Sequence, residues 1–372
     1  MNRMTTTTTL AALVARARAE GPVRVAVADA AQEVVLATMA RAAKEGLAVP
    51  HLVGPRAEIE PLAREAGLAI DALCLHDSGP DAEAAARAVR LVREGRADVV
   101  MKGNLHTDTF MRVLLDAETG LRLPGRRVSH IFVLEVPGHD RLIGVTDAAV
   151  NIAPDLAAKA QICQNAIDAF HAIGVAEPRV AVLSAVETVT PGVVSTLDAA
   201  ALAVMARRGQ IVGAKLDGPL AFDNAVSPRA AAEKAIVSEV AGRADILLVP
   251  DLVTGNVLAK ALEYLGGAKA AAVALGLAAP VVLTSRADTE EARIASLALA
   301  ALLRAKPKAG AAAPRAAELH RSLSAAPAGE DACCPLPQTG ERGGAAPAIP
   351  PTGAPRRAGA STNAAIRASF WT

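Results

Sequence analysis

Short runs of β-branched and aliphatic residues alternate with amphipathic stretches of helical length, and this alternation constrains the fold more than any other feature. The apolar runs predict strands at Val23–Ala28, His51–Val53, Asp98–Met101, Val128–Val136, Arg141–Thr146, Arg179–Leu183, Ile211–Ala214, Ile246–Val249 and Val281–Leu283. The stretches between them predict helices at Ala30–Glu45, Ala82–Glu94, Thr107–Leu115, Leu156–Ile173, Thr196–Arg207, Pro228–Ala241, Thr254–Leu265 and Thr289–Leu303. We therefore expect an α/β fold with a mostly parallel sheet covered on both faces.

One pair of strands departs from this alternation. Val128–Val136 and Arg141–Thr146 are separated only by the short segment PGHD. A connection of that length is typical of a β-hairpin, so we expect a local antiparallel addition to the parallel sheet.

The composition excludes several classes of function. Lys and Arg total 39 against 38 Asp and Glu, and this balance argues against nucleic acid or a membrane surface as partner. Aromatic residues make up 2% of the chain, too few for base-stacking platforms. The four cysteines are too few and too scattered for a disulfide scaffold, and the adjacent pair Cys333 and Cys334 has neither a C-x-x-C spacing nor a neighbouring histidine, so we expect no metal site.

The two ends of the chain differ from its middle. The N-terminus has no apolar signal core, and the longest uncharged apolar stretch, 270–285, is interrupted by Gly276 and Pro280, so we expect a cytoplasmic protein. Residues 306–372 are rich in Ala, Pro, Gly and Arg and contain no Val. A segment this poor in branched apolar side chains is predicted to be disordered.

Polar and small residues gather directly after five of the predicted strands. These loops are KGNLHTDT, TDAAVNIAPD, KLDGPLAFDNAVS, PDLVTGN and TSRADTEE. Ligands of parallel sheets bind beyond the carboxyl ends of the strands, where backbone donors and cations suit a phosphate. The five loops together predict a site for an anionic ligand.

Each loop also has a purely structural interpretation. Ser285 and Arg286 follow a strand and suit an oxyanion, yet Ser285 also suits a helix N-cap and Arg286 a surface ion pair. Asp223 is, taken alone, more typical of a turn than of a ligand. His106 and His130 are more typical of satisfied structural histidines than of ligands.

Familiar catalytic signatures are absent from the sequence. Lys102 and Gly103 follow a strand without the glycine spacing of a Walker A loop. No G-x-G-x-x-G follows a strand, so the standard dinucleotide fingerprint is missing, and neither G-x-S-x-G nor H-E-x-x-H occurs.

Six long segments resemble the phosphate acetyltransferase/phosphate butyryltransferase family. They are MKGNLHTDTFMRVLL, RRVSHIFVLEVPG, GVTDAAVNIAPDLAAKAQI, AKLDGPLAFDNAVS, DILLVPDLVTGNVLAKAL and APVVLTSRADTEEARIASLALA. The resemblance is nearly continuous from about residue 23 to residue 303, in the order and spacing of the family. Some resemble the acyltransferase half of proteins that also carry an enoyl-CoA hydratase domain, for which this chain has no room.

The resemblance implies a two-domain architecture like that of isocitrate and isopropylmalate dehydrogenases, with mostly parallel sheets and the site in the cleft between the domains. Residues 1–148 and 279–305 would form the first domain and residues 149–278 the inserted second one. It also implies a homodimer or higher homo-oligomer.

The implied reaction is the conversion of acyl-CoA and phosphate into acyl phosphate and CoA. CoA and phosphate are then substrates, and no cofactor is implied. Because phosphate is itself a competent nucleophile, positioning and charge neutralisation would dominate catalysis, without a covalent enzyme intermediate.

By the same resemblance, three residues of the last loop are assigned to the reacting centre. Arg286 would neutralise phosphate or the thioester oxygen, Ser285 would donate a hydrogen bond, and Asp288 is a candidate carboxylate. The acetyltransferase branch has a carboxylate at a position that aligns with Ala292, so the base is left open between Asp288, neighbouring glutamates and no base at all.

Further motif positions are expected along the cleft. Arg112 resembles an arginine of the family's first domain that approaches CoA or phosphate, and its alternative is a solvated charge on a helix. The full set of expected phosphate- and CoA-binding residues is Lys102, Gly103, Asn104, Arg112, Asp147, Asn151, Gly218, Pro219, Asp223, Thr254, Gly255 and Asn256.

Two rival functions remain at this point. A metal- and NAD-dependent dehydrogenase on the same scaffold would need clustered carboxylates and a nicotinamide site, which these motifs do not supply. A non-catalytic acyl-CoA- or phosphate-binding protein is the other, against which Ser285 and Arg286 argue.

Overall fold

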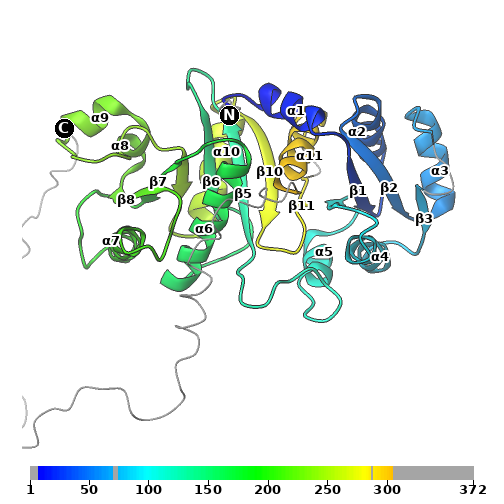
Figure 1. Ribbon diagram of the computed structural model, residues 1–372, viewed down its shortest axis with the longest axis horizontal. Helices are drawn as coiled ribbons and strands as arrows, with labels where there is room; N and C mark the ends of the chain where they lie inside the picture. Colours follow the sequence, from blue (N-terminus) through cyan, green and yellow to red (C-terminus); the bar gives the residue numbers. More distant parts are fainter. Residues whose placement is uncertain (1–6, 70–73, 286–287, 305–372) are drawn as a thin grey trace, which may run out of the picture. The chain divides into compact units, whose positions relative to one another are not determined.

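A computed structural model describes residues 7–69, 74–285 and 288–304. These residues form an eleven-stranded sheet in the order β3-β2-β1-β4-β11-β10-β5-β6-β9-β7-β8 (Figure 1). The strands are β1 (Val23–Ala28), β2 (Ala48–Gly54), β3 (Leu75–Asp77), β4 (Val99–Lys102), β5 (Ser129–Glu135), β6 (Leu142–Thr146), β7 (Arg179–Leu183), β8 (Lys215–Leu220), β9 (Ile246–Leu248), β10 (Lys269–Leu275) and β11 (Val281–Val282).

Helices connect most of these strands, as the alternating pattern predicts. They are α1 (Leu10–Ala19), α2 (Glu33–Lys44), α3 (Arg56–Glu65), α4 (Ala82–Arg93), α5 (Thr107–Leu114), α6 (Leu156–Ala172), α7 (Val194–Arg207), α8 (Phe222–Val226), α9 (Pro228–Glu233), α10 (Leu252–Tyr264) and α11 (Glu290–Arg304). The fold is therefore mixed α/β with a large, mostly parallel sheet, as expected.

The sheet consists of two parallel groups of strands that run in opposite directions. The first strand group is β3, β2, β1, β4 and β11, and the second is β6, β9, β7 and β8; within each group the pairing is parallel. Strands β10 and β5 join the two groups through antiparallel pairings. The carboxyl ends of the two groups consequently point toward opposite edges of the sheet.

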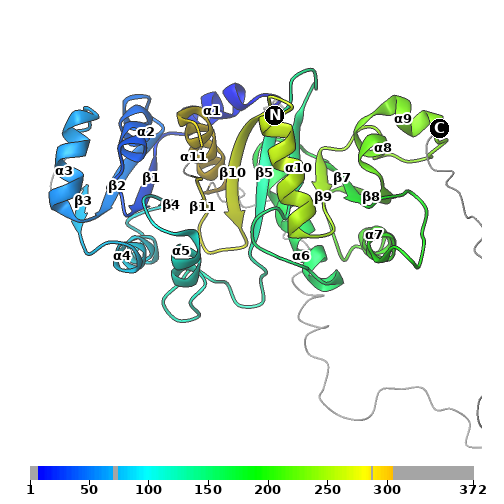
Figure 2. The same cartoon turned by 180° about the vertical axis from the view of Figure 1, so that it is seen from behind.

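Helices cover both faces of the sheet. On one face a continuous apolar cluster contains residues of α1, α2, α3, α6, α7 and α11. On the other face the core is divided into one cluster beneath α4 and α5 and another beneath α8, α9 and α10. Figures 1 and 2 show the two faces from opposite sides: α6 lies in front of the sheet in Figure 1, and α10 lies in front of it in Figure 2.

The predicted hairpin is confirmed. β5 and β6 pair antiparallel from Ile131 opposite Thr146 to Glu135 opposite Leu142, and the PGHD segment connects them. Because β6 then begins the second strand group, this hairpin is the place where the direction of the parallel strands reverses.

Two predicted elements are wrong in position. Ile211–Ala214 is not a strand, because Gly213 adopts φ 84°, and the strand is instead β8, Lys215–Leu220. The helix predicted over Pro228–Ala241 ends at Glu233, and Ala235, two residues later, has φ 51°. Gly218 and Pro219 therefore lie within a strand rather than in the loop that follows one.

Other elements were not anticipated. α1, α3, α8, β3 and β10 have no counterpart in the predicted set. β10 was missed because its sequence, KAAAVAL, is rich in alanine, which has little preference for strands.

Some predictions fall outside the described residues. These are the disordered tail over 306–372 and the position of Arg286. Within the described part, no helix combines the length and hydrophobicity that a membrane crossing requires.

Candidate functional site

Lys102 and Ser285 lie at neighbouring strand ends of the first group. Lys102 is the last residue of β4, and β4 pairs in parallel with β11, whose chain continues to Thr284 and Ser285. The Thr284 hydroxyl donates a hydrogen bond of 3.1 Å to the carbonyl of Lys102. Lys102 is buried, whereas Ser285 is exposed.

Gly103 and Asn104 are held against the end of β1. The Gly103 amide donates to the Ala28 carbonyl at 2.9 Å, and the Asn104 amide donates to the Asp29 carbonyl at 2.7 Å. A Cβ at Gly103 would lie 2.1 Å from that Asp29 carbonyl oxygen, so only glycine fits this approach. Asp29 itself is buried and has φ 54°.

Ser285 and Asp288 are bound to each other. The Ser285 amide donates a hydrogen bond of 2.7 Å to Asp288 Oδ2. Burial raises the pKa of the Asp288 carboxyl, and this hydrogen bond acts in the opposite direction. The positive charges of Lys260 and Lys102 also lower it.

Helix α10 brings residues of the second strand group toward this carboxyl. Lys260 and Glu263 lie in its last turns, and burial together with the negative charge of Asp288 raises the pKa of Glu263. We name Lys102, Gly103, Ser285, Asp288 and Lys260 the β4–β11 site. It contains two ammonium groups, an exposed hydroxyl and a carboxyl, a set suited to an anionic ligand.

A second set of predicted residues gathers where β6 ends. The Asp147 carboxylate accepts hydrogen bonds of 3.0 Å from the amides of Ala149 and Val150 and further ones from the amide and side chain of Asn151. The Asn151 side chain also donates to the Val128 carbonyl at 2.9 Å. Both side chains thus bind backbone, and burial raises the pKa of Asp147.

The first turn of α10 packs onto the same strand end. Its N-cap is Asp251, which accepts from the amide and the hydroxyl of Thr254 at 2.8 and 3.1 Å. A Cβ at Gly255 would meet the Asp147 carbonyl at 2.7 Å, and Asn256 donates to the Ala148 carbonyl at 3.3 Å.

Gly218, Pro219 and Asp223 form a third location. The first two lie in β8, the last strand of the sheet, and Asp223 lies in α8, where it is exposed and pairs with Lys234 at 3.6 Å. Lys234 also pairs with Glu187 at 3.1 Å.

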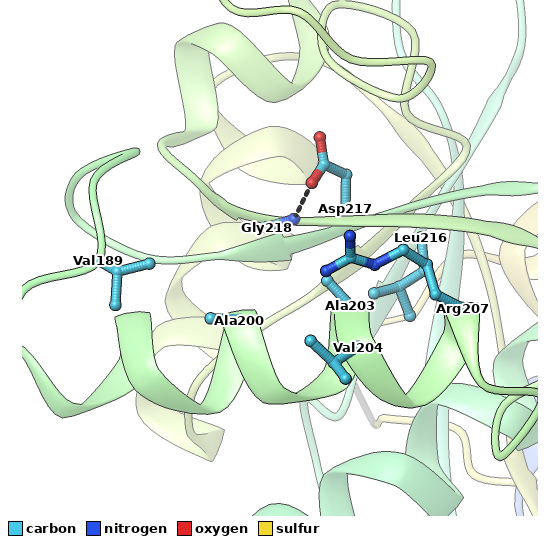
Figure 3. Close-up of a pocket in the computed structure, with 8 residues that line it drawn as sticks. All are labelled: Val189, Ala200, Ala203, Val204, Arg207, Leu216, Asp217 and Gly218. Atoms are coloured by element: carbon cyan, nitrogen blue, oxygen red, sulfur yellow. Dashed lines mark hydrogen bonds between the residues drawn. The ribbon is translucent and has the colours of Figure 1, made fainter.

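A hollow of about 360 Å³ adjoins Gly218 (Figure 3). It lies between α7 and β8, with Arg207 and Asp217 as its charged residues. Six strand spacings of about 4.8 Å separate β8 from β11, so this hollow is roughly 29 Å from the β4–β11 site. It therefore belongs to a different part of the protein.

The five polar loops do not share one edge of the sheet. We expected all five loops to meet at one site, and this expectation is wrong, because the two strand groups run in opposite directions. The loops after β4 and β11 lie at one edge of the sheet, and those after β6 and β9 lie at the opposite edge. Helix α10 links the two edges, because Asn256 contacts the β6 end while Glu263 approaches Asp288. Seven residues of helix span about 10 Å between them.

Two predicted residues, Arg112 and Arg286, belong to none of these three locations as the structure describes them. Arg112 is exposed on α5, and Arg286 lies outside the described residues.

The residues that the sequence analysis missed are Asp29, Lys260, Glu263 and Arg293. A single arginine within the apolar helical run ARIASLALAALL, and an Asp directly after β1, are the signals that could have revealed two of them.

Within the described residues, no group of three or more His, Cys, Asp or Glu side chains is arranged to hold a metal ion.

Comparisons with known proteins identify the relatives of this chain. A family model described as phosphate acetyl/butaryl transferase matches residues 80–301. A phosphate acetyltransferase of Rhizobium meliloti is 52% identical over 297 residues, which cover 80% of this chain and 94% of the relative. A phosphate butyryltransferase of Clostridium acetobutylicum is 46% identical over 280 residues, covering 75% and 93%.

A solved structure agrees with these relatives. A branched-chain phosphotransacylase from Enterococcus faecalis V583 is 30% identical, covers 76% of this chain and 99% of its own, and superposes with a TM-score of 0.67. With the family model matching more than half of its residues, this chain belongs to the phosphate acetyl/butyryl transferase family.

Proposed function

We propose that this chain is a phosphate acyltransferase that converts a short-chain acyl-CoA and phosphate into an acyl phosphate and CoA, reversibly. Membership of the family and two relatives named for acetyl and butyryl transfer support this function. CoA and phosphate are substrates in this proposal, and no cofactor takes part.

The proposed reaction is a direct attack within a ternary complex. A phosphate oxygen adds to the thioester carbonyl carbon, and the tetrahedral centre then collapses as the carbon–sulfur bond breaks and CoA thiolate leaves. The protein holds the two anionic substrates together and neutralises developing charge.

The observation that carries this proposal is that β4 and β11 end side by side, with Lys102 at one strand end and Ser285 beyond the other, near a carboxyl that feels two lysine charges. Lys102 from β4 and Lys260 from α10 both lower the pKa of Asp288, which is bonded to the amide of the exposed Ser285. In the proposal, the ammonium groups attract the phosphates and Ser285 donates to the tetrahedral centre or to the leaving sulfur. Asp288 orients the Ser285 segment, and Arg286 adds a further cation.

The β6 end has a different proposed role. Asp147 and Asn151 bind backbone, and Thr254, Gly255 and Asn256 seat α10 against that strand end. We propose that they hold α10 in the position from which Lys260 reaches the β4–β11 site. Asn104 and Arg112, both exposed, remain candidates for binding CoA, as do Gly218, Pro219 and Asp223 for shaping a more distant part of the substrate site.

The finer architecture is part of the same proposal. We propose the two-domain arrangement of the isocitrate and isopropylmalate dehydrogenases, with residues 1–148 and 279–305 in one domain and 149–278 in the other. We also propose a homodimer or higher homo-oligomer, and a molar mass close to the monomer's 37.8 kDa in multi-angle light scattering would contradict it.

Phosphorolysis of acetyl-, propionyl- and butyryl-CoA tests the function. Release of CoA, followed with a thiol reagent, should require phosphate and should yield acyl phosphate in equal amount. A phosphate-independent release, or CoA binding without any acyl phosphate, would overturn the proposal in favour of a hydrolase or a non-catalytic binding protein. Reduction of NAD(P) with a hydroxy acid and a divalent metal would favour the dehydrogenase instead.

A further inference from the structure

Arg293 is the largest fully buried side chain of the described residues, with 1% of its surface exposed. It lies in the first turn of α11, in a helix whose neighbouring residues Ile294, Ala295 and Leu297 belong to the apolar core. Taking a guanidinium group out of water is costly unless its donors are satisfied. The partners of Arg293 therefore indicate why the chain keeps a charge at this position.

Those partners belong to the segment that carries Ser285 and Asp288. Arg293 Nη2 donates a hydrogen bond of 2.8 Å to the Ser285 carbonyl, and Nε lies 3.4 Å from the Asp288 carbonyl. The Ser285 amide is in turn bonded to the Asp288 carboxylate at 2.7 Å. One planar guanidinium group thus binds the backbone carbonyls of both Ser285 and Asp288, which are also hydrogen-bonded to each other.

From this geometry we infer that Arg293 is a positioning residue, which holds Ser285 and Asp288 in the orientation needed for acyl transfer. The inference rests on the proposed function, since it deepens the description of the same site. Arg293 lies in the core beneath the segment and acts through Ser285 and Asp288.

The planar shape of the guanidinium group is essential to this role. Its donors point in fixed directions, so two carbonyl groups bound to it are fixed relative to each other. A lysine has a single ammonium group on a flexible stem and cannot hold two carbonyls in one plane. Since a displacement of about 1 Å at a reacting centre can reduce turnover roughly 100-fold, loosening the grip should affect kcat.

Charge gives the same residue a second effect. Arg293 is one of three cations, with Lys260 and Lys102, that favour the ionised form of Asp288, and Glu263 faces them as the opposing negative charge. Removal of Arg293 should therefore raise the pKa of Asp288 further and move the acidic limb of the pH profile of kcat to higher pH.

Arg41 provides a matched control. Its guanidinium also binds the beginning of α11, through Glu290 at 2.9 Å, but it is half-exposed and makes this contact on the helix rather than on the Ser285 segment. Arg41→Met should weaken the attachment of α11 without disturbing Ser285 or Asp288.

Steady-state kinetics of Arg293→Lys, Arg293→Met and Arg41→Met, together with thermal unfolding, test the inference. We expect Arg293→Met to lower kcat roughly 100-fold while the KM values for phosphate and butyryl-CoA change less than about 3-fold. Arg293→Lys should keep the charge yet lower kcat about 10-fold without moving the acidic limb, and Arg41→Met should retain kcat and its pH profile.

Two results would overturn the inference. One is a folded Arg293→Met with kcat within about 2-fold of the wild type, and the other is an Arg293→Lys variant with full kcat. If Arg293→Met does not fold, Arg293→Lys decides alone. A wild-type protein without phosphate-dependent acyl transfer would instead refute the proposed function, so the two failures are distinguishable.

Discussion

Gly103 packs so closely against the Asp29 backbone that position 103, directly after β4, has no space for any side chain. The Cβ of an alanine would lie 2.1 Å from the Asp29 carbonyl oxygen and 2.6 Å from that of Ala28. Both oxygens are backbone atoms that also accept hydrogen bonds from Gly103 and Asn104. This contact fixes the direction in which the chain leaves Lys102.

Gly103→Ala should therefore damage both the fold and the activity. Because backbone atoms must move, we expect a loss of about 1–3 kcal/mol in the free energy of unfolding. The kcat/KM for acyl transfer should fall as well, since the shift is transmitted to Lys102. Urea unfolding and steady-state kinetics measure the two effects.

Gly192→Ala is the matched control for this prediction. A Cβ at Gly192 meets no atom within 4 Å, so the same substitution there should leave stability and turnover unchanged. Equal behaviour of the two variants would contradict the role assigned to the Gly103 contact.

Lys102 and Lys159 are both buried lysines, but we expect Lys102 to support catalysis and Lys159 to support the stability of the fold. Lys102 lies beside Asp288, whereas Lys159 forms an ion pair of 2.6 Å with Asp198. We expect Lys102→Met to lower kcat/KM roughly 100-fold, the scale of losing one charge-stabilising donor in a catalytic site.

Lys159→Met should instead lower stability, because it leaves Asp198 without its cation, and should retain kcat/KM per folded molecule. Activity titrated against the folded fraction, measured by circular dichroism, separates the two cases. Retention of activity in Lys102→Met would remove Lys102 from the proposed site.

Much of the fold was predictable from local pattern. β7 coincides with the predicted strand, and the β5–β6 hairpin follows from the short PGHD connection. These elements depend on residues close together in the chain, where periodicity and turn length are informative.

The candidate site was less predictable because it depends on pairing between distant strands. Strand direction reverses at β10 and β5, and the Ala-rich β10 gives no strong strand signal. Without that strand, the sequence pattern predicts that all the polar loops lie at the same ends of parallel strands. Lys260 was missed for a related reason: it lies within a helix rather than in a loop after a strand, and the packing of α10 brings its charge near Asp288.

Lys260 offers a test of the contribution of α10 to the site. It is exposed, and its ammonium group lies 5.5 Å from the centre of the Tyr264 ring. Since an exposed side chain contributes little to stability, Lys260→Ala should leave the melting temperature nearly unchanged. We expect it to raise the KM for acyl-CoA or phosphate, or to lower kcat/KM, by about 10-fold or more.

Lys269, an exposed lysine at the start of β10, is the control for Lys260. Lys269→Ala removes the same charge from the protein without removing it from Asp288. An equal loss of activity in both variants would assign the effect to overall charge, and no loss in Lys260→Ala would separate α10 from the site.

Acid lability should originate in part from His130, in the middle of the sheet. Burial lowers the pKa of His130 to about 4, its Nδ1 has no hydrogen-bond partner among the described residues, and its ring packs edge-on against Phe132 with centroids 4.8 Å apart. The unfolded chain binds a proton at this residue near pH 6.5, whereas the folded chain does so only near pH 4. Stability supplied by the neutral ring is thus present above pH 6.5 and is lost as the pH falls toward 4, by up to about 3 kcal/mol.

His130→Phe should remove most of this pH dependence, because a neutral aromatic ring of similar size occupies the same place in β5. Urea unfolding at several pH values between 7 and 4 measures it, with the exposed His106→Phe as control. His76, whose pKa burial and the neighbouring His51 also lower to about 4, should account for part of the remaining slope. If the free energy of unfolding depends on pH equally in the wild type and His130→Phe but does not depend on pH in His76→Gln, the acid-sensitive group is His76, in the outermost strand β3, rather than His130.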